Sequence, residues 1–188
     1  MAPEELAEIG AEGVRPLKRS EYERLVELGL FQDERVELVR GVILKMSPQN
    51  APHAAVVQRL TQILVRILSG RADVRVQLSF AASDDSEPEP DIALVDPGDY
   101  DDAHPNRARL IIEVADTSLR KDRRLKAEVY AASGVPEYWV VNLVDRQIEV
   151  SSDPVRGTYS RVTTHRLGES IRLVQFPDLE IAVADILR

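Results

Sequence analysis

Hydrophobic residues recur along the chain in two patterns, one typical of amphipathic helices and one typical of strands. The clearest helical pattern is PHAAVVQRLTQILVRILSG, residues 52–70, and its last residue, Gly70, is a common helix stop. The apolar residues of this segment gather on one side, which is predicted to face the core: Ala55, Leu60, Ile63, Leu64, Ile67 and Leu68.

Two shorter patterns predict further helices. EYERLVELG, residues 21–29, is preceded by Ser20, which forms a capping-box signature with Glu23. LRKDRRLKAEVYAASG predicts a helix at 120–133 that ends at Gly134.

Short apolar or alternating runs predict the strands. RVELVRGVILKMS predicts two strands that turn at Arg40-Gly41, and DVRVQLSF, residues 73–80, alternates so that one face is polar. DIALVD and ARLIIEVAD follow, and the second is too apolar to have a wet face, which indicates a central strand. PEYWVVNL and IEVSS come next, and TYSRVTTHRL and EIAVADILR are expected at the edges.

The order of these elements predicts an α/β fold. Helix, strand, strand, strand, helix and strand follow one another, with a hairpin before them and short strands after them. The strand–helix–strand unit at 109–143 predicts a right-handed parallel crossover, while the other connections suit antiparallel pairing. We expect one domain over 1–188, a mixed β-sheet flanked by helices, with a loose leader at 1–15 and a core at about 52–151.

The amino-acid composition limits the kinds of metal site that the chain can form. The 188 residues contain no cysteine, which excludes disulfides and thiolate metal sites, and only three histidines. A metal would therefore be held by carboxylates, which favours Mg²⁺ or Mn²⁺. The apolar runs are too short to span a membrane and the acidic N-terminus is unlike a signal peptide, so a cytoplasmic protein is expected. The net charge of -8 argues against non-specific coating of nucleic acid, but it is compatible with a local basic surface.

Two acids stand at the ends of neighbouring predicted strands. If strands 91–96 and 108–115 pair antiparallel with Asp96 opposite Ala108, Asp91 lies opposite Glu113. Like charges placed opposite each other in a sheet are destabilising, and burying them unpaired costs more. The pair therefore predicts a nearby cation, which is a metal ion, a lysine or both.

The helix at 120–133 offers the lysine. Asp122, Lys126 and Tyr130 are spaced to share one face, from which Lys126 is expected to reach Glu113. The remaining basic residues are expected to point elsewhere and to form a patch that binds nucleic acid: Arg120, Lys121, Arg123 and Arg124. A metal on two carboxylates, a lysine and a basic rim suit phosphodiester hydrolysis.

The segments PEPDIALVD and LIIEVADTSLRKDRRLKAEVYAASGVPEYWVV resemble the Uma2 (Uma-two) family of restriction endonucleases, once known only as a domain of unknown function. That family belongs to the restriction-endonuclease-like PD-(D/E)XK superfamily. The resemblance implies that Asp91 and Glu113 bind the metal. The superfamily usually places its lysine at the position of Ala115, and some members supply it from the following helix, which makes Lys126 the natural replacement. Gln77, Glu37, His53, Glu89, Asp122 and Tyr130 are expected at the rim of the site.

Simpler interpretations stand beside these. Asp91 could cap its strand after Pro90, and Lys126 could pair only with Asp122 on a solvated helix face. The run RKDRR could be solvated as well. His53 is interpreted as a surface or supporting residue, and Glu37 as an exposed member of an alternating strand.

The sequence therefore predicts a Mg²⁺- or Mn²⁺-dependent endonuclease that hydrolyses DNA, with Asp91, Glu113 and Lys126 as its catalytic residues. A homodimer is expected from the resemblance, because cutting both strands of a duplex needs two sites. Two alternatives remain. One is a nucleic-acid-binding module that has lost catalysis, favoured by Ala115 and the net charge of -8. The other is a structural or regulatory homodimer in which the acids merely pair with Lys126 and the neighbouring arginines.

Overall fold

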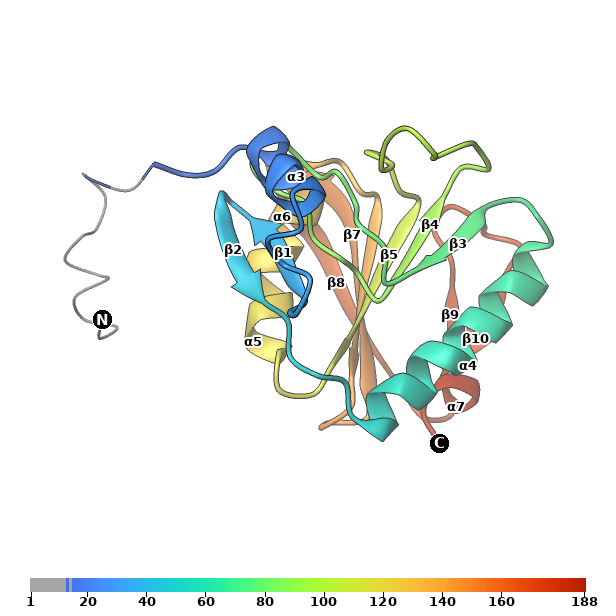
Figure 1. The fold of residues 1–188 in the computed structure, drawn as a ribbon. Helices are drawn as coiled ribbons and strands as arrows, with labels where there is room; N and C mark the ends of the chain where they lie inside the picture. Colours follow the sequence, from blue (N-terminus) through green and yellow to red (C-terminus); the bar gives the residue numbers. More distant parts are fainter. Residues whose placement is uncertain (1–12, 14) are drawn as a thin grey trace.

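A six-stranded mixed sheet forms the centre of the fold in a computed structural model, which describes residue 13 and residues 15–188 (Figure 1). Its strands lie side by side in chain order: β3 (Asp73–Val76), β4 (Ile92–Val95), β5 (Leu110–Ala115), β6 (Glu137–Asn142), β7 (Gln147–Val155) and β8 (Thr158–Arg166). Only β5 and β6 are parallel, which confirms the predicted parallel pairing across 109–143. The predicted mixed sheet flanked by helices is confirmed.

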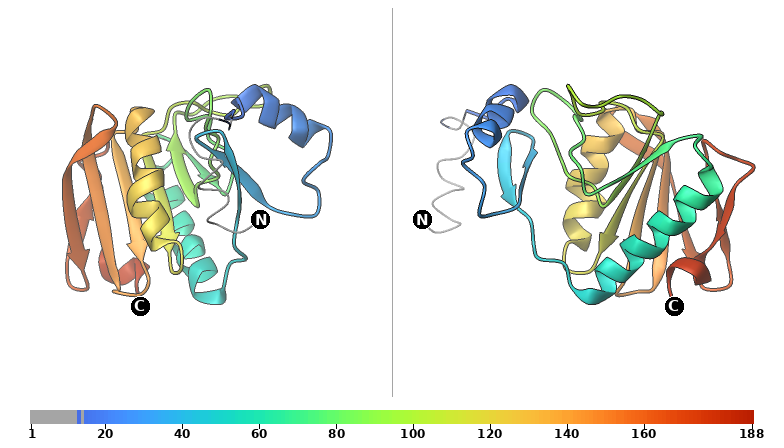
Figure 2. Two further views of the ribbon diagram at one scale, coloured as in Figure 1. Left: turned by 90° about the vertical axis from the view of Figure 1, so that its left-hand side faces the viewer. Right: turned by 45° about the vertical axis from the view of Figure 1, so that its right-hand side comes forward.

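Helices cover both faces of this sheet (Figure 2). Alternate residues of β5 show why: Leu110, Ile112 and Val114 pack in a cluster with the helix α4 (Ala51–Leu68), whereas Ile111 and Ala115 pack in a second cluster with Tyr130. Tyr130 belongs to the other helical segment, which consists of α5 (Leu119–Lys121), the π-helical turn η1 (Asp122–Lys126) and α6 (Ala127–Ala132). The central position predicted for β5 is confirmed, because all six of its residues are buried.

The N-terminal part consists of α3 (Arg19–Glu27) and a hairpin of β1 (Val36–Val39) and β2 (Val42–Lys45). The hairpin turns at Arg40 and Gly41 as predicted, and both residues have positive φ. The predicted cap of α3 is wrong. The helix begins earlier, so Glu21 accepts a hydrogen bond from the backbone N–H of Lys18 at 2.9 Å, while Glu23 pairs with Arg19.

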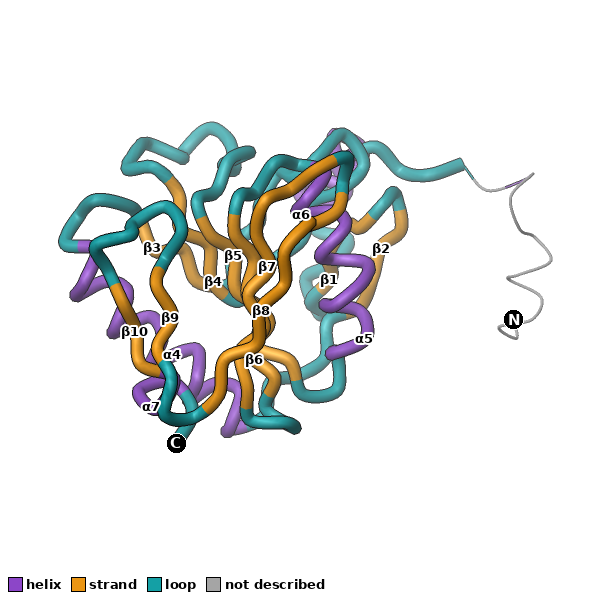
Figure 3. Tube along the Cα trace, turned by 180° about the vertical axis from the view of Figure 1, so that it is seen from behind, coloured by secondary structure: helices purple, strands orange, loops and turns teal. Residues whose placement is uncertain are grey.

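Three further expectations differ from the structure. The strand predicted over 73–80 ends at Val76, because Gln77 has a φ of 54° and breaks the alternation. The helix predicted at 120–133 contains the π turn η1. The segment EIAVADILR forms β10 (Glu180–Ala182), which pairs with β9 (Ser170–Arg172) in a separate small sheet, and the helix α7 (Val183–Ile186), both beside α4 (Figure 3).

The leader expected at 1–15 lies almost wholly outside the described residues. Within the part that the structure describes, no helix is long and apolar enough to cross a membrane.

Candidate active site

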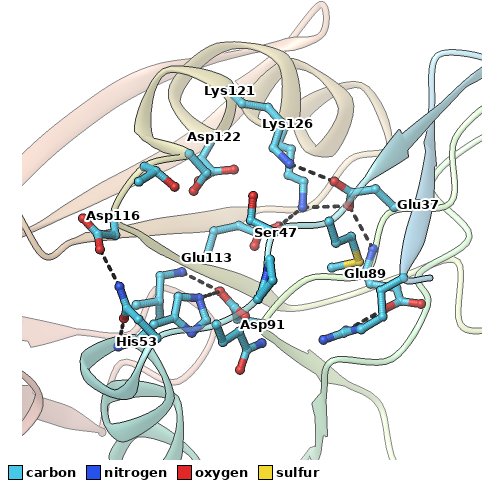
Figure 4. A pocket seen from close by; sticks show the side chains of 18 residues that line it. Glu37, Ser47, His53, Glu89, Asp91, Glu113, Asp116, Lys121, Asp122 and Lys126 are labelled. Carbon is cyan, nitrogen blue, oxygen red and sulfur yellow. Dashed lines mark hydrogen bonds and ion pairs between the residues drawn. The ribbon is translucent and has the colours of Figure 1, made fainter. Parts of the chain in front are cut away.

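Asp91 and Glu113 lie at the same end of the paired strands β4 and β5. Ile92 pairs with Ile112 and Leu94 with Leu110, which is the register predicted from the sequence. Asp91 Oδ2 accepts a hydrogen bond from the backbone N–H of Val114, the neighbour of Glu113, at 2.8 Å. The two acids therefore line one cavity of about 110 Å³ (Figure 4).

Asp91 is held by three donors and is 8 % exposed. Besides Val114, His53 Nε2 lies 3.0 Å from Oδ2, and Gln77 Nε2 donates to Oδ1 at 3.4 Å. Burial would lower the pKa of His53, but the hydrogen bond and charge of Asp91 outweigh it and raise that pKa above its ordinary value. His53 therefore supports Asp91, in keeping with its interpretation as a supporting residue.

Glu113 is almost fully buried, and its side chain accepts hydrogen bonds from the helical segment that contains η1 and α6. Its Oε1 accepts hydrogen bonds from Lys126 Nζ and from the Tyr130 hydroxyl, each at 2.8 Å. Burial raises the pKa of Glu113 to about 8, and although Lys126 opposes this, the negative charges of Asp122, Asp91 and Glu37 reinforce it. Burial and the neighbouring acids thus outweigh the one ammonium group that is bonded to Glu113.

The helical segment carries Asp122, Lys126 and Tyr130 into the interior, as the shared face predicts. Lys126 is 3 % exposed and Asp122 is 2 % exposed, so the interpretation of a solvated helix face is wrong. Asp122 accepts a hydrogen bond from the Ser118 hydroxyl, and burial raises its pKa. Asp122 and Lys126 are the first and last residues of the π turn η1. Such turns are frequent at functional sites, and sequence periodicity does not reveal them.

Glu37 completes the buried part of the cavity. It is 0 % exposed, and its two oxygens accept from Lys121 Nζ at 3.0 Å and from Lys126 Nζ at 2.9 Å. The interpretation of Glu37 as an exposed strand residue is therefore wrong, because all four residues of β1 are buried. Burial alone would raise the pKa of Glu37, but the two lysines hold it below its ordinary value.

The predicted basic patch is only partly formed. Lys121 turns towards Glu37, and Arg123, although exposed, is bound to Glu149, so both are held in ion pairs within the fold. Arg120 and Arg124 are exposed and line a neighbouring cavity of about 570 Å³. That cavity adjoins the active-site cavity, since four residues line both: Ser47, Thr117, Ser118 and Lys121.

Glu89 lies at the rim, where Arg35 Nη2 donates to it at 2.8 Å. Other rim residues were missed from the sequence. The side chain of Asn50 caps α4 by accepting the N–H of His53 at 3.0 Å, and it donates to Asp116 at 2.7 Å. Asn before Ala-Pro at a helix start is an N-cap signal that could have located Asn50. Asp116 follows a buried strand, and nothing in the local pattern marks it.

The donor set suits a hard divalent cation. Acidic side chains outnumber basic ones in the lining of the cavity, six to three: Glu37, Glu89, Asp91, Glu113, Asp116 and Asp122 against Arg35, Lys121 and Lys126. The described residues contain no group of three or more acidic or histidine side chains placed to hold a metal ion. A metal here would therefore rest on two carboxylates and fill its remaining positions with water or phosphate oxygens, as Mg²⁺ commonly does.

Known proteins share features with this chain. The model of a family named Uma2, described as "Putative restriction endonuclease", matches residues 19–184. Among proteins with curated descriptions, none matches. A crystal structure described as a putative nuclease belonging to DUF820, from Anabaena variabilis ATCC 29413, has a similar fold, with a TM-score of 0.73 and 14% identity. The match covers 91% of this chain and 97% of that chain.

Proposed function

The chain belongs to the Uma2 family, and from this premise we propose that it is an endonuclease, dependent on Mg²⁺ or Mn²⁺, that hydrolyses phosphodiester bonds in DNA. One observation carries the proposal: Asp91 and Glu113, from adjacent strands, and Lys126, from the covering helix, line the same cavity. The excess of carboxylates over ammonium groups supports a cation there. We also propose that the chain acts as a single domain.

In this proposal, Asp91 and Glu113 hold the metal. When bound, Mg²⁺ or Mn²⁺ would polarise the phosphate and lower the pKa of an attacking water. His53 and Gln77 fix the carboxylate of Asp91, so that it meets the ion without reorganising. The Tyr130 hydroxyl fixes the carboxylate of Glu113 in the same way.

Lys126 supplies fixed positive charge. Burial would lower its pKa, but Glu113, Glu37 and Asp122 outweigh this and raise it, so the ammonium group stays charged across the physiological range. A charged donor held beside the scissile phosphate stabilises the negative charge that grows in the transition state. The superfamily's usual lysine position, Ala115, is 0 % exposed in the core beneath the helix, and Lys126 approaches Glu113 from that helix instead.

Arg120 and Arg124 are proposed to hold the DNA backbone. They line the cavity that adjoins the active site, and the hydroxyls of Ser47, Thr117 and Ser118 lie between them and the acids. Arginines and hydroxyls are the usual donors to phosphate oxygens. A strand lying along both cavities would place one phosphate at the acids and a neighbouring one at the arginines.

Nicking of supercoiled plasmid DNA tests the activity. Wild-type protein with 5 mM Mg²⁺ or Mn²⁺, on the order of the millimolar levels that such ions need when two carboxylates hold them, should convert the plasmid to nicked and linear forms. Chelation with EDTA, Asp91→Asn and Glu113→Gln should each abolish this. Asp185→Asn, an exposed acid on α7, is the control and should cut normally. Cutting that survives both active-site substitutions would contradict the assignment.

A second function is favoured by one observation: Lys126 is bonded to two carboxylates at once. This arrangement suits a nuclease fold that binds nucleic acid without cutting it. Binding of DNA and Mn²⁺ without nicking, and with no effect of Lys126→Arg, would support that alternative. For the active enzyme we propose a homodimer, because two cuts need two sites; sedimentation equilibrium at micromolar concentration tests this, and a monomer would contradict it.

A further inference from the structure

A further cavity lies at the end of the molecule where α3 lies, and it meets the active-site cavity only at Glu89. Its volume is about 460 Å³, and its walls come from α3, the segment before β4 and the loop after β4. Figure 1 shows α3 and that loop along the same edge of the fold. Glu89 is the one described residue that lines both this cavity and the active-site cavity. The two cavities therefore adjoin at Glu89, and the rest of their linings differ.

Glu87 lines this further cavity, and its carboxylate has unused hydrogen-bonding capacity. Its backbone is fixed by two hydrogen bonds with Leu38 of β1, at 2.8 and 3.3 Å, and the residue is 3 % exposed. Its Oε2 is buried without a hydrogen-bond partner, and its Oε1 lies 3.8 Å from His104 Nε2, beyond hydrogen-bond distance. Buried carboxylate oxygens almost always have a donor, so this one indicates a missing ligand.

The surrounding charges do not neutralise Glu87. Arg19, the cation of this cavity's wall, is bound to Glu23 and to the carbonyl oxygen of Ser83. Burial and the nearby charge of Arg75 lower the pKa of His104, so the imidazole is neutral at pH 7. Further acids at the rim, Asp101 and Asp102 among them, add negative charge. The cavity is therefore suited to a cation.

The walls indicate an organic cation. No group of three or more acidic or histidine side chains is placed to hold a metal among the residues that the structure describes. Tyr22 and Tyr100 line the cavity. The Tyr100 ring already carries one guanidinium, that of Arg75, 5.2 Å from its centroid, and the Tyr22 ring stacks on Phe31. A free carboxylate beside aromatic walls binds planar guanidinium well, because the group donates to both carboxylate oxygens and its face stacks on rings.

We propose that this cavity binds a guanidinium group, with Glu87 as its anionic partner. The group is carried either by a small guanidinium compound or by an arginine side chain of a partner protein. The site uses neither Asp91 nor Glu113, so it stands whether or not the chain cuts DNA.

Isothermal titration of the full chain with methylguanidinium chloride at pH 8 tests the proposal. Saturable binding is expected in wild-type protein, at least tenfold weaker in Glu87→Gln and unchanged in Asp185→Asn, which removes one negative charge elsewhere. Equal affinity in wild-type protein and Glu87→Gln would overturn the proposal, as would the lack of saturable binding. Methylammonium that binds as tightly, or Mn²⁺ that displaces methylguanidinium, would also overturn it.

A measurement that needs no variant gives the same decision. In amide NMR spectra of wild-type protein, methylguanidinium should shift signals of α3 and of residues 100–104, and leave those of α7 unchanged. Shifts confined to other regions would contradict the site. A blocked peptide, acetyl-Gly-Arg-Gly-amide, separates the two sources of the ligand: tighter binding than methylguanidinium indicates a protein arginine, and weaker binding indicates a small molecule.

Discussion

Lys126 Nζ lies 2.8 Å from Glu113 and 2.9 Å from Glu37, so one buried ammonium group joins the central sheet to the N-terminal hairpin. Glu113 comes from β5, and Glu37 comes from β1, a strand of a separate two-stranded sheet. The lysine is thus at once an ion-pair partner in the core and the proposed source of positive charge for catalysis. These two roles can be separated by substitution.

Lys126→Met should slow nicking strongly and destabilise the fold. It leaves Glu113 and Glu37 buried without their shared cation, which should lower the free energy of unfolding by about 3 to 5 kcal/mol. Loss of a fixed cationic donor should reduce the cleavage rate by about 10²- to 10³-fold. Urea denaturation and plasmid nicking measure the two effects. Lys126→Arg keeps the charge and is expected to recover most of the stability; a Lys126→Met variant that cuts normally would rule out a catalytic lysine.

The prediction of Lys126 from sequence succeeded because it depended on local geometry. Antiparallel pairing of the two strands, with Asp96 placed opposite Ala108, gave the register of Asp91 and Glu113. The helical repeat placed Lys126 above Glu113. Glu37 could not be found in this way. Its burial depends on the segment before β4, where Glu87 pairs with Leu38 through backbone hydrogen bonds across almost fifty residues of chain.

Lys121 and Gln77 are two further residues whose conformation was not predicted from the sequence. The direction of Lys121 depends on Glu37 and on the π turn, which adds a residue to one helical turn and changes the face that each side chain occupies. Gln77 ends β3 with a positive φ, although Gln is not a residue that favours this conformation. Local propensity therefore gave the order of the elements, and long-range contacts decided the details of the site.

Glu37→Gln should lower nicking without removing the metal. The substitution removes the charge that holds Lys121 and Lys126 in place, so we expect about tenfold slower cleavage, from displaced lysines. Calorimetric titration should show Mn²⁺ binding as in wild-type protein, because Glu37 is a positioning residue in this proposal. Glu34→Gln, an exposed acid just before the same hairpin, is the matched control. Loss of Mn²⁺ binding in Glu37→Gln would make Glu37 a ligand instead.

Arg120→Ser combined with Arg124→Ser should weaken DNA binding in a salt-dependent way. Each phosphate contact that is lost should reduce the slope of log affinity against log salt by about one, measured by fluorescence anisotropy. Arg123→Ser removes the same charge from the same helix, but its guanidinium is already bound to Glu149, so the slope should stay unchanged. Equal effects at the three arginines would show that the two cavities do not form one DNA-binding surface.

Glu87→Gln should stabilise the protein at high pH and have little effect at low pH. Burial raises the pKa of Glu87 to about 7, and the charge of Glu23 reinforces this. Arg19 and His104 also face the carboxyl group, but Arg19 is bound to Glu23, and His104 is neutral at pH 7. The folded chain therefore holds the proton of Glu87 more tightly than the unfolded chain, whose value is near 4.5.

The direction in which stability changes with pH follows from this difference in the pKa of Glu87. Below the pKa that Glu87 has in the unfolded chain, the group is protonated in both the folded and the unfolded chain and does not change the stability. As the pH rises towards 7, Glu87 ionises first in the unfolded chain, and the stability of wild-type protein falls. The loss in the free energy of unfolding is complete above about pH 7 and is at most about 3 kcal/mol. A glutamine at position 87 does not ionise, so the variant avoids this loss. Urea denaturation should therefore show Glu87→Gln more stable than wild-type protein at pH 8 by about 1 to 3 kcal/mol and similar to it at pH 4.5. Because an exposed acid has no such difference, Asp185→Asn should follow the wild-type curve, and a Glu87→Gln variant that is less stable at pH 8 would show that the carboxylate already has a partner in the fold.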